Sequence, residues 1–144
     1  MFSGAYFHSV DNKGRTVIPA KFRARLGERF YITRGLHGCL WIFSDMHWSE
    51  FQKKLTPRSL LDSDALKLER FFLGSAVECT PDGQGRIGIP ENLRKYAGID
   101  DDIWVVGLGT RVEIWSNARW EEFNNSLTDE VIQDLGQNLD LGWF

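Results

Sequence analysis

Cysteine and long apolar runs are both scarce in this sequence of 144 residues, and each scarcity excludes a class of protein. Two cysteines, Cys39 and Cys79, cannot form the disulfide framework that holds small secreted domains together. The apolar runs are only a few residues long, so we expect no transmembrane segment. The N-terminal residues lack the basic stretch, apolar stretch and cleavage site of a signal peptide. The sequence therefore predicts a globular cytoplasmic protein whose two thiols are buried.

Catalytic signatures are also missing. The chain has no G-x-S-x-G motif, no phosphate-binding P-loop and no array of Cys, His and Asp at catalytic spacing. A zinc site of His8, Cys39 and Cys79 is conceivable, but no pair of them has the spacing of zinc ligands. We therefore predict no enzyme activity, no metal, no cofactor and no small-molecule substrate.

Positive charge is in the minority overall but is concentrated near the start of the chain. The net charge of −3 would by itself argue against a nucleic-acid-binding protein. Residues 1–34, however, carry seven Lys or Arg and two acids, a sum of +5, whereas residues 121–144 carry six acids and no Lys or Arg. This asymmetry indicates a basic working surface and an acidic tail, although ordinary solvated surfaces also form clusters of this size.

What the sequence does contain is a repeat. The stretch DNKGRTVIPAKFR (11–23) returns 71 residues later as DGQGRIGIPENLR (82–94), with the shared pattern D-x-x-G-R-x-x-I-P-x-x-[FL]-R. After one extra residue the correspondence continues at an offset of 72 through four further pairs: Gly35 and Gly107, Ser44 and Ser116, Trp48 and Trp120, and Phe51 and Phe123. Two copies of one fold unit are the simplest explanation.

The first half of each unit is predicted from its turn chemistry. Residues 5–10 are expected to form a strand, residues 11–14 a tight turn, and residues 15–18 a second strand, so that the two strands pair as a hairpin. Pro19 is suited to the first position of a helix, and Gly27 to its end. Phe22 and Leu26 give this short helix one apolar side.

The second half of each unit is predicted to contain two strands and a capped helix. In the first unit the strands are FYIT and CLWIF around the turn RGLHG, and VVGLGTRVEIW repeats this arrangement in the second unit. Each following helix begins at a capping serine and turns its aromatic residues to the core. The residues expected to fill these roles are Ser44 (or Asp45), Trp48, Phe51, Leu55, Ser116 and Trp120.

These signals divide the chain into four predicted segments. They are a first unit (1–55), a linker (56–73), a second unit (74–125) and an acidic tail (126–144). Within the linker we expect a turn at Pro57 and a helix over 63–72. We expect a short helix at 131–135 and a loose end at 137–144. One unit is too small to bury a good core alone, so the two units must pack together into a mainly β fold with short helices.

The repeat also carries a resemblance to a known family. The segments MFSGAYFHSVDNKGRTVIPAKFR, RFFLGSAVECTPDGQGRIGIPENLRKYAG and VEIWSNARWEEF resemble the MraZ family, which is related to the AbrB/SpoVT swapped-hairpin DNA-binding domains. The resemblance covers residues 1 to about 125. It implies a pseudo-twofold barrel of two tandem units with exchanged hairpins, and chains that assemble into a ring.

The resemblance further implies a function. Members of the family are transcriptional regulators of the division and cell wall gene cluster, and they bind short G-rich direct repeats in their own promoter. The implied partners are double-stranded DNA and further copies of the chain, without a membrane, and the implied location is the cytoplasm and nucleoid. The D-x-x-x-R loops would face the DNA.

The chemistry of the first loop fits this role. Arg15 follows a tight turn, where its guanidinium can donate two parallel hydrogen bonds to the O6 and N7 of guanine. Asp11 and Gly14 are expected to shape the loop, with Asp11 orienting Arg15 by a charge-assisted hydrogen bond. Asp11 is not expected to contact DNA, because phosphates repel its carboxylate. Asn12, Lys13 and Lys21 are predicted contacts to DNA, with Lys21 directed to the phosphate backbone.

The second loop is expected to have the same shape and less positive charge. Asp82 and Gly85 take the shaping positions and Arg86 the reading position, but Gly83 and Gln84 replace the Asn-Lys pair. Residues 75–98 have no net charge. Both Asp–Arg pairs could instead be plain turn-stabilising pairs. For the matched Arg23 and Arg94 a structural role is favoured over DNA contact.

One further alternative stays open at this point. Related swapped-hairpin domains occur in antitoxins, so the chain could be a protein-binding module without an operator of its own. The doubled unit argues against this reading, because such antitoxins usually supply one unit and dimerise.

Overall fold

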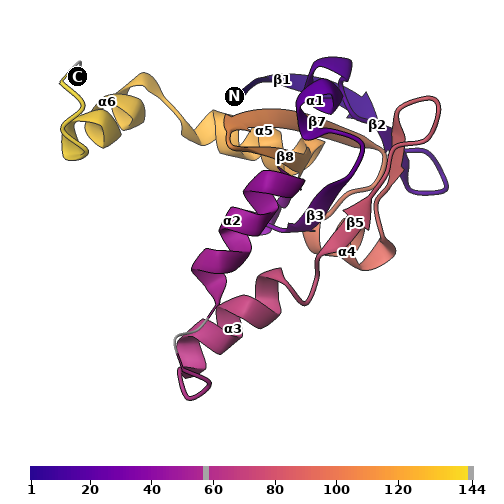
Figure 1. Cartoon of the computed structure of the whole chain (residues 1–144). Coiled ribbons are helices and arrows are strands. Elements are labelled where there is room, and N and C mark those ends of the chain that lie inside the picture. The colour runs from indigo at the N-terminus through magenta and orange to yellow at the C-terminus, as the bar shows by residue number, and fades with distance from the viewer. Residues whose placement is uncertain (57–58, 143–144) are drawn as a thin grey trace.

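The computed structural model of the protein describes residues 1–56 and 59–142, and its fold is mainly β with short helices (Figure 1). The first half of the chain comprises β1 (Phe2–Ser9), β2 (Arg15–Val17), α1 (Ala20–Leu26), β3 (Phe30–Arg34), the 3-10 turn η1 (Leu36–Gly38), β4 (Leu40–Ser44), α2 (Asp45–Leu55) and α3 (Ser63–Phe72). The second half comprises β5 (Val77–Cys79), β6 (Arg86–Gly88), α4 (Glu91–Ala97), β7 (Asp102–Gly109), β8 (Arg111–Ser116), α5 (Asn117–Ser126) and α6 (Asp129–Asn138).

The main sheet has a strand order that shows the predicted twofold relation. Six antiparallel strands follow one another as β1-β7-β8-β4-β3-β5. Exchanging each strand for its equivalent in the other unit, β1 for β5, β3 for β7 and β4 for β8, gives the same order read backwards. The pseudo-twofold axis therefore passes between β4 and β8, where Trp41 lies opposite Glu113.

A second, two-stranded sheet lies on the same axis. It pairs β2 with β6, so that Arg15 lies opposite Gly88, Thr16 opposite Ile87 and Val17 opposite Arg86. The predicted hairpin of the first two strands is therefore wrong, since β1 pairs with β7 and β2 pairs with β6. Hydrophobic alternation identifies a strand but not its partner, and here each partner comes from the other unit.

Most local signals were interpreted correctly. Gly27 ends α1 with a φ of 85°, and the hydroxyl of Ser44 accepts a hydrogen bond from the backbone N–H of His47 at 3.3 Å to cap α2. Pro19 lies one position earlier than expected, as the N-cap of α1. The linker helix is present with the predicted bounds, and the predicted tail helix is longer, reaching Asn138. The turn predicted at Pro57 lies outside the described residues.

The core lies between the six-stranded sheet and the short elements that carry the loops. Both units contribute equally, with Phe22 of α1 and Leu93 of α4 fully enclosed at equivalent places. The other large side chains that are fully enclosed come from the six-stranded sheet and from the residues directly after β2 and β6: Ile18, Phe30, Ile32, Leu40, Ile42, Ile89, Ile103, Val105, Val112 and Ile114. The two units therefore share one hydrophobic core, as the size argument required.

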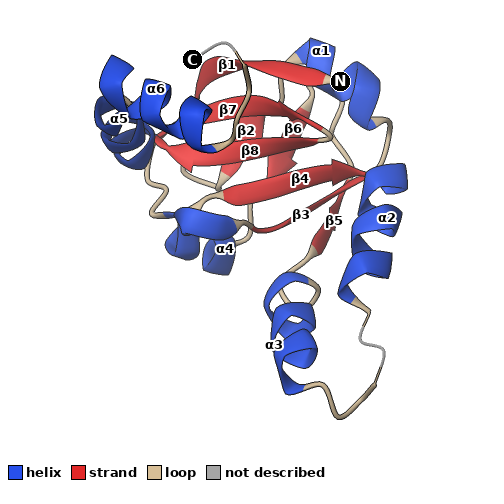
Figure 2. Ribbon diagram, turned by 90° about the vertical axis from the view of Figure 1, so that its left-hand side faces the viewer, coloured by secondary structure: helices blue, strands red, loops and turns tan. Residues whose placement is uncertain are grey.

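One predicted feature, the barrel, is not closed in the structure. β1 and β5 remain the edges of the six-stranded sheet within the described residues, so the pseudo-twofold arrangement is present without a closed ladder around a barrel. In the view of Figure 2, α2 lies to the right of the sheet, α3 below it, and α5 and α6 to its left. No described helix has the length and apolar content needed to cross a lipid bilayer.

Candidate nucleic-acid interface

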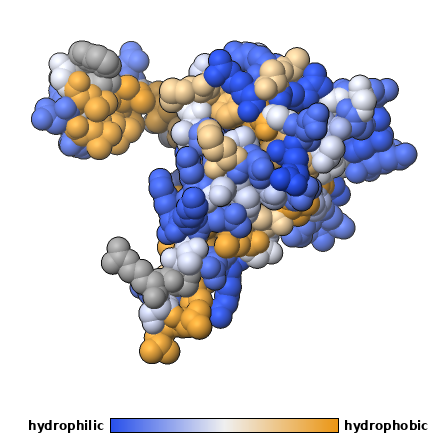
Figure 3. All heavy atoms as spheres, viewed as in Figure 1, coloured by the Kyte–Doolittle hydropathy of each residue, from blue (hydrophilic) through white to orange (hydrophobic). Residues whose placement is uncertain are grey.

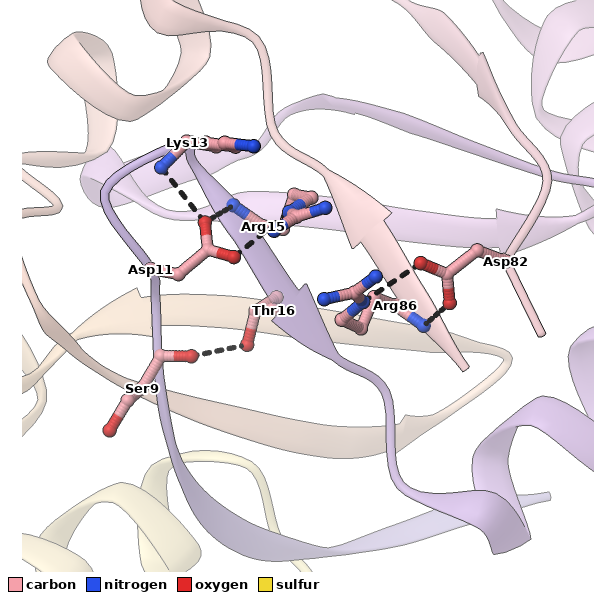
Figure 4. Close-up of polar contacts among 7 residues, drawn as sticks. All are labelled: Ser9, Asp11, Lys13, Arg15, Thr16, Asp82 and Arg86. Carbon is pink, nitrogen blue, oxygen red and sulfur yellow. Dashed lines mark hydrogen bonds and ion pairs between the residues drawn. The ribbon is translucent and has the colours of Figure 1, made fainter. Parts of the chain in front are cut away.

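The first loop is held by one carboxylate. Oδ1 of Asp11 accepts hydrogen bonds from the backbone N–H groups of Lys13 at 2.9 Å and Arg15 at 2.8 Å, while Oδ2 accepts from Nε of Arg15 at 2.9 Å (Figure 4). The backbone N–H of Asp11 donates in return to the Arg15 carbonyl, and Gly14 takes a φ of 76°. This is the Asx-type turn that the sequence indicated.

The second loop has the same geometry. Oδ1 of Asp82 accepts from the backbone N–H groups of Gln84 and Arg86 at 2.9 Å each, and Oδ2 accepts from Nε of Arg86 at 2.8 Å. Gly85 has a φ of 75°. The two aspartates therefore accept the same set of hydrogen bonds. Residues 12–13 and 83–84 can differ between the loops, because no hydrogen bond of the turn uses their side chains.

The carboxylates also have a shared electrostatic signature. The backbone hydrogen bond from Arg15 lowers the pKa of Asp11 below its ordinary value, and that from Arg86 does the same for the pKa of Asp82, with further lowering from the Arg side chains. Both aspartates are thus firmly ionised at neutral pH. Within each guanidinium only Nε donates to the carboxylate, and the Nη groups of Arg15 and Arg86 make no hydrogen bond within residues 1–56 and 59–142.

The two-stranded sheet brings both arginines to one face. Side chains alternate along a strand, so the register places Arg15, Val17, Arg86 and Gly88 on one side and Thr16 and Ile87 on the other. Thr16 and Ile87 are buried, whereas the side chains of Arg15 and Arg86 are 34% and 30% exposed. The arginines occupy diagonal positions, which lie roughly 7–8 Å apart in an antiparallel pair. Figure 4 shows them side by side on the adjacent strands.

Each loop is supported from the opposite unit, a feature that the sequence analysis missed. The guanidinium of Arg94 lies against Gly14, and that of Arg23 lies against Gly85, so closely that a Cβ at either glycine would collide with it. Arg94 also donates to the carbonyl of Ile89. The structural role expected for these arginines is therefore confirmed. Their matched positions were the available signal, but the crossing between units requires knowledge of the strand pairing.

The remaining predicted contacts differ in their surroundings. Asn12 and Lys13 are exposed at the tip of the first loop. The ammonium group of Lys21 lies over the ring of Tyr6, 5.2 Å from its centre, on the exposed side of α1. A contact between Lys21 and phosphate therefore stays a prediction.

Two of the three residues considered for a zinc site lie on opposite edges of the sheet. His8 is on β1 and Cys79 on β5, which are the two opposite edges of the six-stranded sheet. No group of three or more potential metal ligands occurs among the residues that the structure describes. Burial raises the pKa of Cys39 to about 12 and that of Cys79 to about 11, so both thiols stay protonated at neutral pH.

Comparison with known proteins identifies the family. Two stretches of the chain, 1–71 and 72–139, match the family model described as "MraZ protein, putative antitoxin-like". The protein named Transcriptional regulator MraZ of Thermoanaerobacter pseudethanolicus is 48% identical over 140 residues, 97% of each chain. Proteins of the same name from Moorella thermoacetica and Halothermothrix orenii are 48% identical over 130 residues and 43% identical over 142 residues, covering at least 90% of each chain. This chain belongs to the MraZ family.

Proposed function

We propose that this protein is a sequence-specific DNA-binding transcriptional regulator that acts on short direct repeats in its own promoter, ahead of the division and cell wall genes. Arg15, assisted by Arg86, reads guanine in the major groove, and several chains in a ring-shaped oligomer bind successive repeats. The proposal places the protein in the cytoplasm, on the nucleoid. The observation that carries it is the single exposed face on which β2 and β6 present both arginines.

The shape of this face supports the proposal. The major groove of B-DNA admits a two-stranded β-ribbon, and β2–β6 is such a ribbon, with its other side closed by the core. Arg15 and Arg86 are held at Nε, while their Nη groups make no hydrogen bond with the residues that the structure describes. A pre-oriented arginine loses less side-chain entropy when it donates to guanine O6 and N7.

The distribution of charge supports it as well. Lys13 extends the positive charge of Arg15 along the first loop, and the only acids within the two turn motifs, Asp11 and Asp82, are neutralised by their arginines. Phosphate contacts by such a surface release counterions, which gives affinity without sequence preference. The names of the relatives, all transcriptional regulators, agree with this chemistry.

One ribbon cannot supply the affinity of an operator alone. A specific complex needs about 4–10 kcal/mol beyond non-specific binding, whereas one bidentate contact discriminates by about 1–3 kcal/mol. Copies arrayed in one direction around a ring would meet direct repeats, and would require them on one face of the duplex, about every 10–10.5 base pairs.

Footprinting on the DNA directly upstream of the gene tests the function, and a gel-shift series tests the arrangement. We expect protection of repeated boxes, a large loss of affinity when five base pairs are inserted between them, and a smaller loss when ten are inserted. Absence of a footprint would refute DNA-binding regulation, while indifference to the insertions would refute simultaneous binding of the boxes.

A second candidate function is kept because of the antitoxin-like description of the family model. In that case the exposed ribbon would bind a protein partner, and the chain would have no operator of its own. Affinity purification from cells would then recover one partner in stoichiometric amount, and the upstream DNA would give no footprint.

A further inference from the structure

The two loops that carry the proposed reading arginines are held in place by polar contacts. Residues 11–14 and 82–85 contain no apolar side chain, and Figure 3 shows hydrophilic surface at the right-hand end of the molecule, where both loops lie in Figure 1. The hydrogen bonds of the two aspartates stay within residues 11–15 and 82–86, so they fix the shape of each loop. The place of the loop relative to the core depends on contacts from outside it.

The contacts to the first loop come from the second unit. The backbone N–H of Ile89 donates to the carbonyl of Gly14 at 2.9 Å. The guanidinium of Arg94 lies against the same glycine, which is buried, and donates to the carbonyl of Ile89. Ile89 and Arg94 are thus bonded to each other, and both contact the residue directly before Arg15.

The second loop is held in the same way by the first unit, but less firmly. The backbone N–H of Ile18 donates to the carbonyl of Gly85 at 3.2 Å, and the guanidinium of Arg23 lies against this glycine. Within the described residues, no hydrogen bond joins the Arg23 side chain to Ile18, whereas the equivalent bond from Arg94 is present. The loop that carries Lys13 is therefore the more firmly held, and the residues that hold it belong to the second unit.

The planar shape of the guanidinium suits this contact. It covers a glycine that has no side chain of its own, at a place where a Cβ would collide with the arginine. A lysine ammonium is a compact charge on a flexible stem and cannot cover the same surface. Arg23 and Arg94 are each half-buried and make no ion pair in the described part of the chain, so packing against the glycine, rather than attraction to an acid, sets where they lie.

We propose that Arg94 is a positioning residue for Arg15, and Arg23 for Arg86, so that each unit controls how the loop of the other unit reads DNA. A site built on a loop binds tightly only when its supporting residues hold it in the productive geometry. Because the first loop carries Lys13 and is the more firmly held, Arg94 has the larger effect on binding, although it lies in the segment without net charge. The inference rests on the proposed function, since it assigns DNA reading to the two loops.

Amide hydrogen exchange on the full chain, followed by NMR without DNA, tests the crossed support. Arg94→Met keeps a long aliphatic side chain and removes the guanidinium. It is expected to speed exchange at Gly14 and Arg15 about tenfold and to leave the second loop unchanged, because local opening depends on local contacts. Arg23→Met should do the reverse. Faster exchange in the loop of the substituted unit itself, equal acceleration in both loops, or no change in either loop would overturn the proposal.

Fluorescence anisotropy with the upstream promoter fragment and a scrambled fragment tests the consequence for reading. Arg94→Met is expected to lower the affinity for the promoter about tenfold, and Arg23→Met about threefold, with smaller changes for the scrambled DNA. A phosphate contact would instead weaken both DNAs alike, because it carries no sequence information, and that result or a larger loss for Arg23→Met would overturn the proposal. Lys95→Met removes an exposed cation from the same helix, α4, and is the matched control that should leave the ratio of affinities unchanged.

Two further backgrounds separate positioning from charge and from general loosening. Arg94→Lys keeps the charge and loses the planar group, so it should bind the promoter as weakly as Arg94→Met, and recovery of wild-type affinity would overturn the proposal. In a chain that carries Arg86→Ala, Arg94→Met should keep its effect of about tenfold while Arg23→Met has no further effect, since the loop that it supports no longer reads. A further loss from Arg23→Met in that chain would show that the two supports are not crossed.

Exchange at the core amides of β7 is the folding control. It should be the same in all variants, because neither arginine belongs to the hydrophobic core. If Arg94→Met does not fold, Arg94→Lys gives the same exchange measurement. A wild type that does not prefer the promoter fragment would refute the proposed function, while hydrogen exchange would still decide whether each unit holds the loop of the other.

Discussion

The two D-x-x-G-R loops have nearly the same hydrogen bonds and different charge. In both, an aspartate accepts two backbone N–H groups and the Nε of an arginine at 2.8–2.9 Å, and a glycine takes a φ near 75°. Asn12 and Lys13 in the first loop are replaced by Gly83 and Gln84 in the second. The shape of the loop therefore depends on the repeated residues, while its affinity for a partner can be set by the two residues between them.

Among substitutions in the two loops, that of Arg15 should have the largest effect on promoter binding. We expect Arg15→Ala to abolish specific promoter binding, because each lost bidentate contact removes about 1–3 kcal/mol of discrimination and an oligomer repeats the loss. Fluorescence anisotropy with a promoter fragment measures it, with the mass of the assembly as control. Near wild-type affinity would show that Arg15 does not read the DNA.

Substitution of the loop glycines should show that the two backbones are equivalent. Gly14→Ala and Gly85→Ala each force a side chain into positive φ and against the arginine of the other unit, so both should destabilise the fold by about 1–3 kcal/mol. Gly83→Ala is the matched control, since its φ is ordinary and nothing lies within 4 Å of the added Cβ. Urea denaturation measures all three, and a stable Gly85→Ala variant would break the equivalence.

Substitution of Arg86 should sharpen the difference. Arg86→Ala is expected to weaken binding less than Arg15→Ala, because the second loop lacks the equivalents of Lys13 and Lys21. The converse variant, Gln84→Lys, should strengthen binding. Both are measured by anisotropy at one salt concentration. Equal losses for the two arginines would mean that the loops read DNA equally and that the charge argument is wrong.

The salt dependence should separate the loops by a smaller amount. The logarithm of the binding constant should fall steeply with the logarithm of salt concentration although the protein is acidic overall, by about 0.9 in slope for each phosphate neutralised. Lys13→Gln should make the slope shallower than that of the wild type. A slope near zero for the wild type would remove the electrostatic part of the model.

Acid should produce the smallest effect. Since hydrogen bonds lower the pKa of Asp11 and Asp82 in the folded state, the stabilisation is present above the ordinary carboxyl pKa and is lost as the pH falls through the lowered values. Urea midpoints should therefore be level from pH 7 to about pH 5 and decline at lower pH. Asp11→Asn and Asp82→Asn should each flatten part of that decline by a similar amount, and a decline unaltered in both variants would assign it to other carboxyls.

Much of the local structure could be predicted from the sequence. The repeat, the turn residues, the capping serines and the linker helix follow from short-range chemistry, in which a residue interacts with neighbours four or fewer positions away. The loop hydrogen bonds of Asp11 and Asp82 belong to this group. The position of the Lys21 ammonium group over the ring of Tyr6 does not belong to it, because Lys21 and Tyr6 are fifteen residues apart in the chain.

The long-range arrangement could not be predicted from the same signals. Periodicity gave the strands but not the pairing of β1 with β7 or of β2 with β6, because hydrophobic alternation is the same for any partner. The support of each loop by the arginine of the other unit depends on that pairing. The presence of Arg15 and Arg86 on one face was for this reason also beyond the sequence, and their contact with DNA stays a prediction.

The partner of β1 has a consequence for how the protein is made. Phe2 pairs with Gly109, and Ser9 with Asp102, so the first strand to leave the ribosome has no partner until about 100 further residues have been synthesised. At about 5–20 residues per second this takes roughly 5–20 s. The strand that follows the first loop waits similarly for β6. A prematurely terminated product that lacks the second unit would therefore not fold into a partly active protein. The protein can fold and act only when its translation is nearly complete.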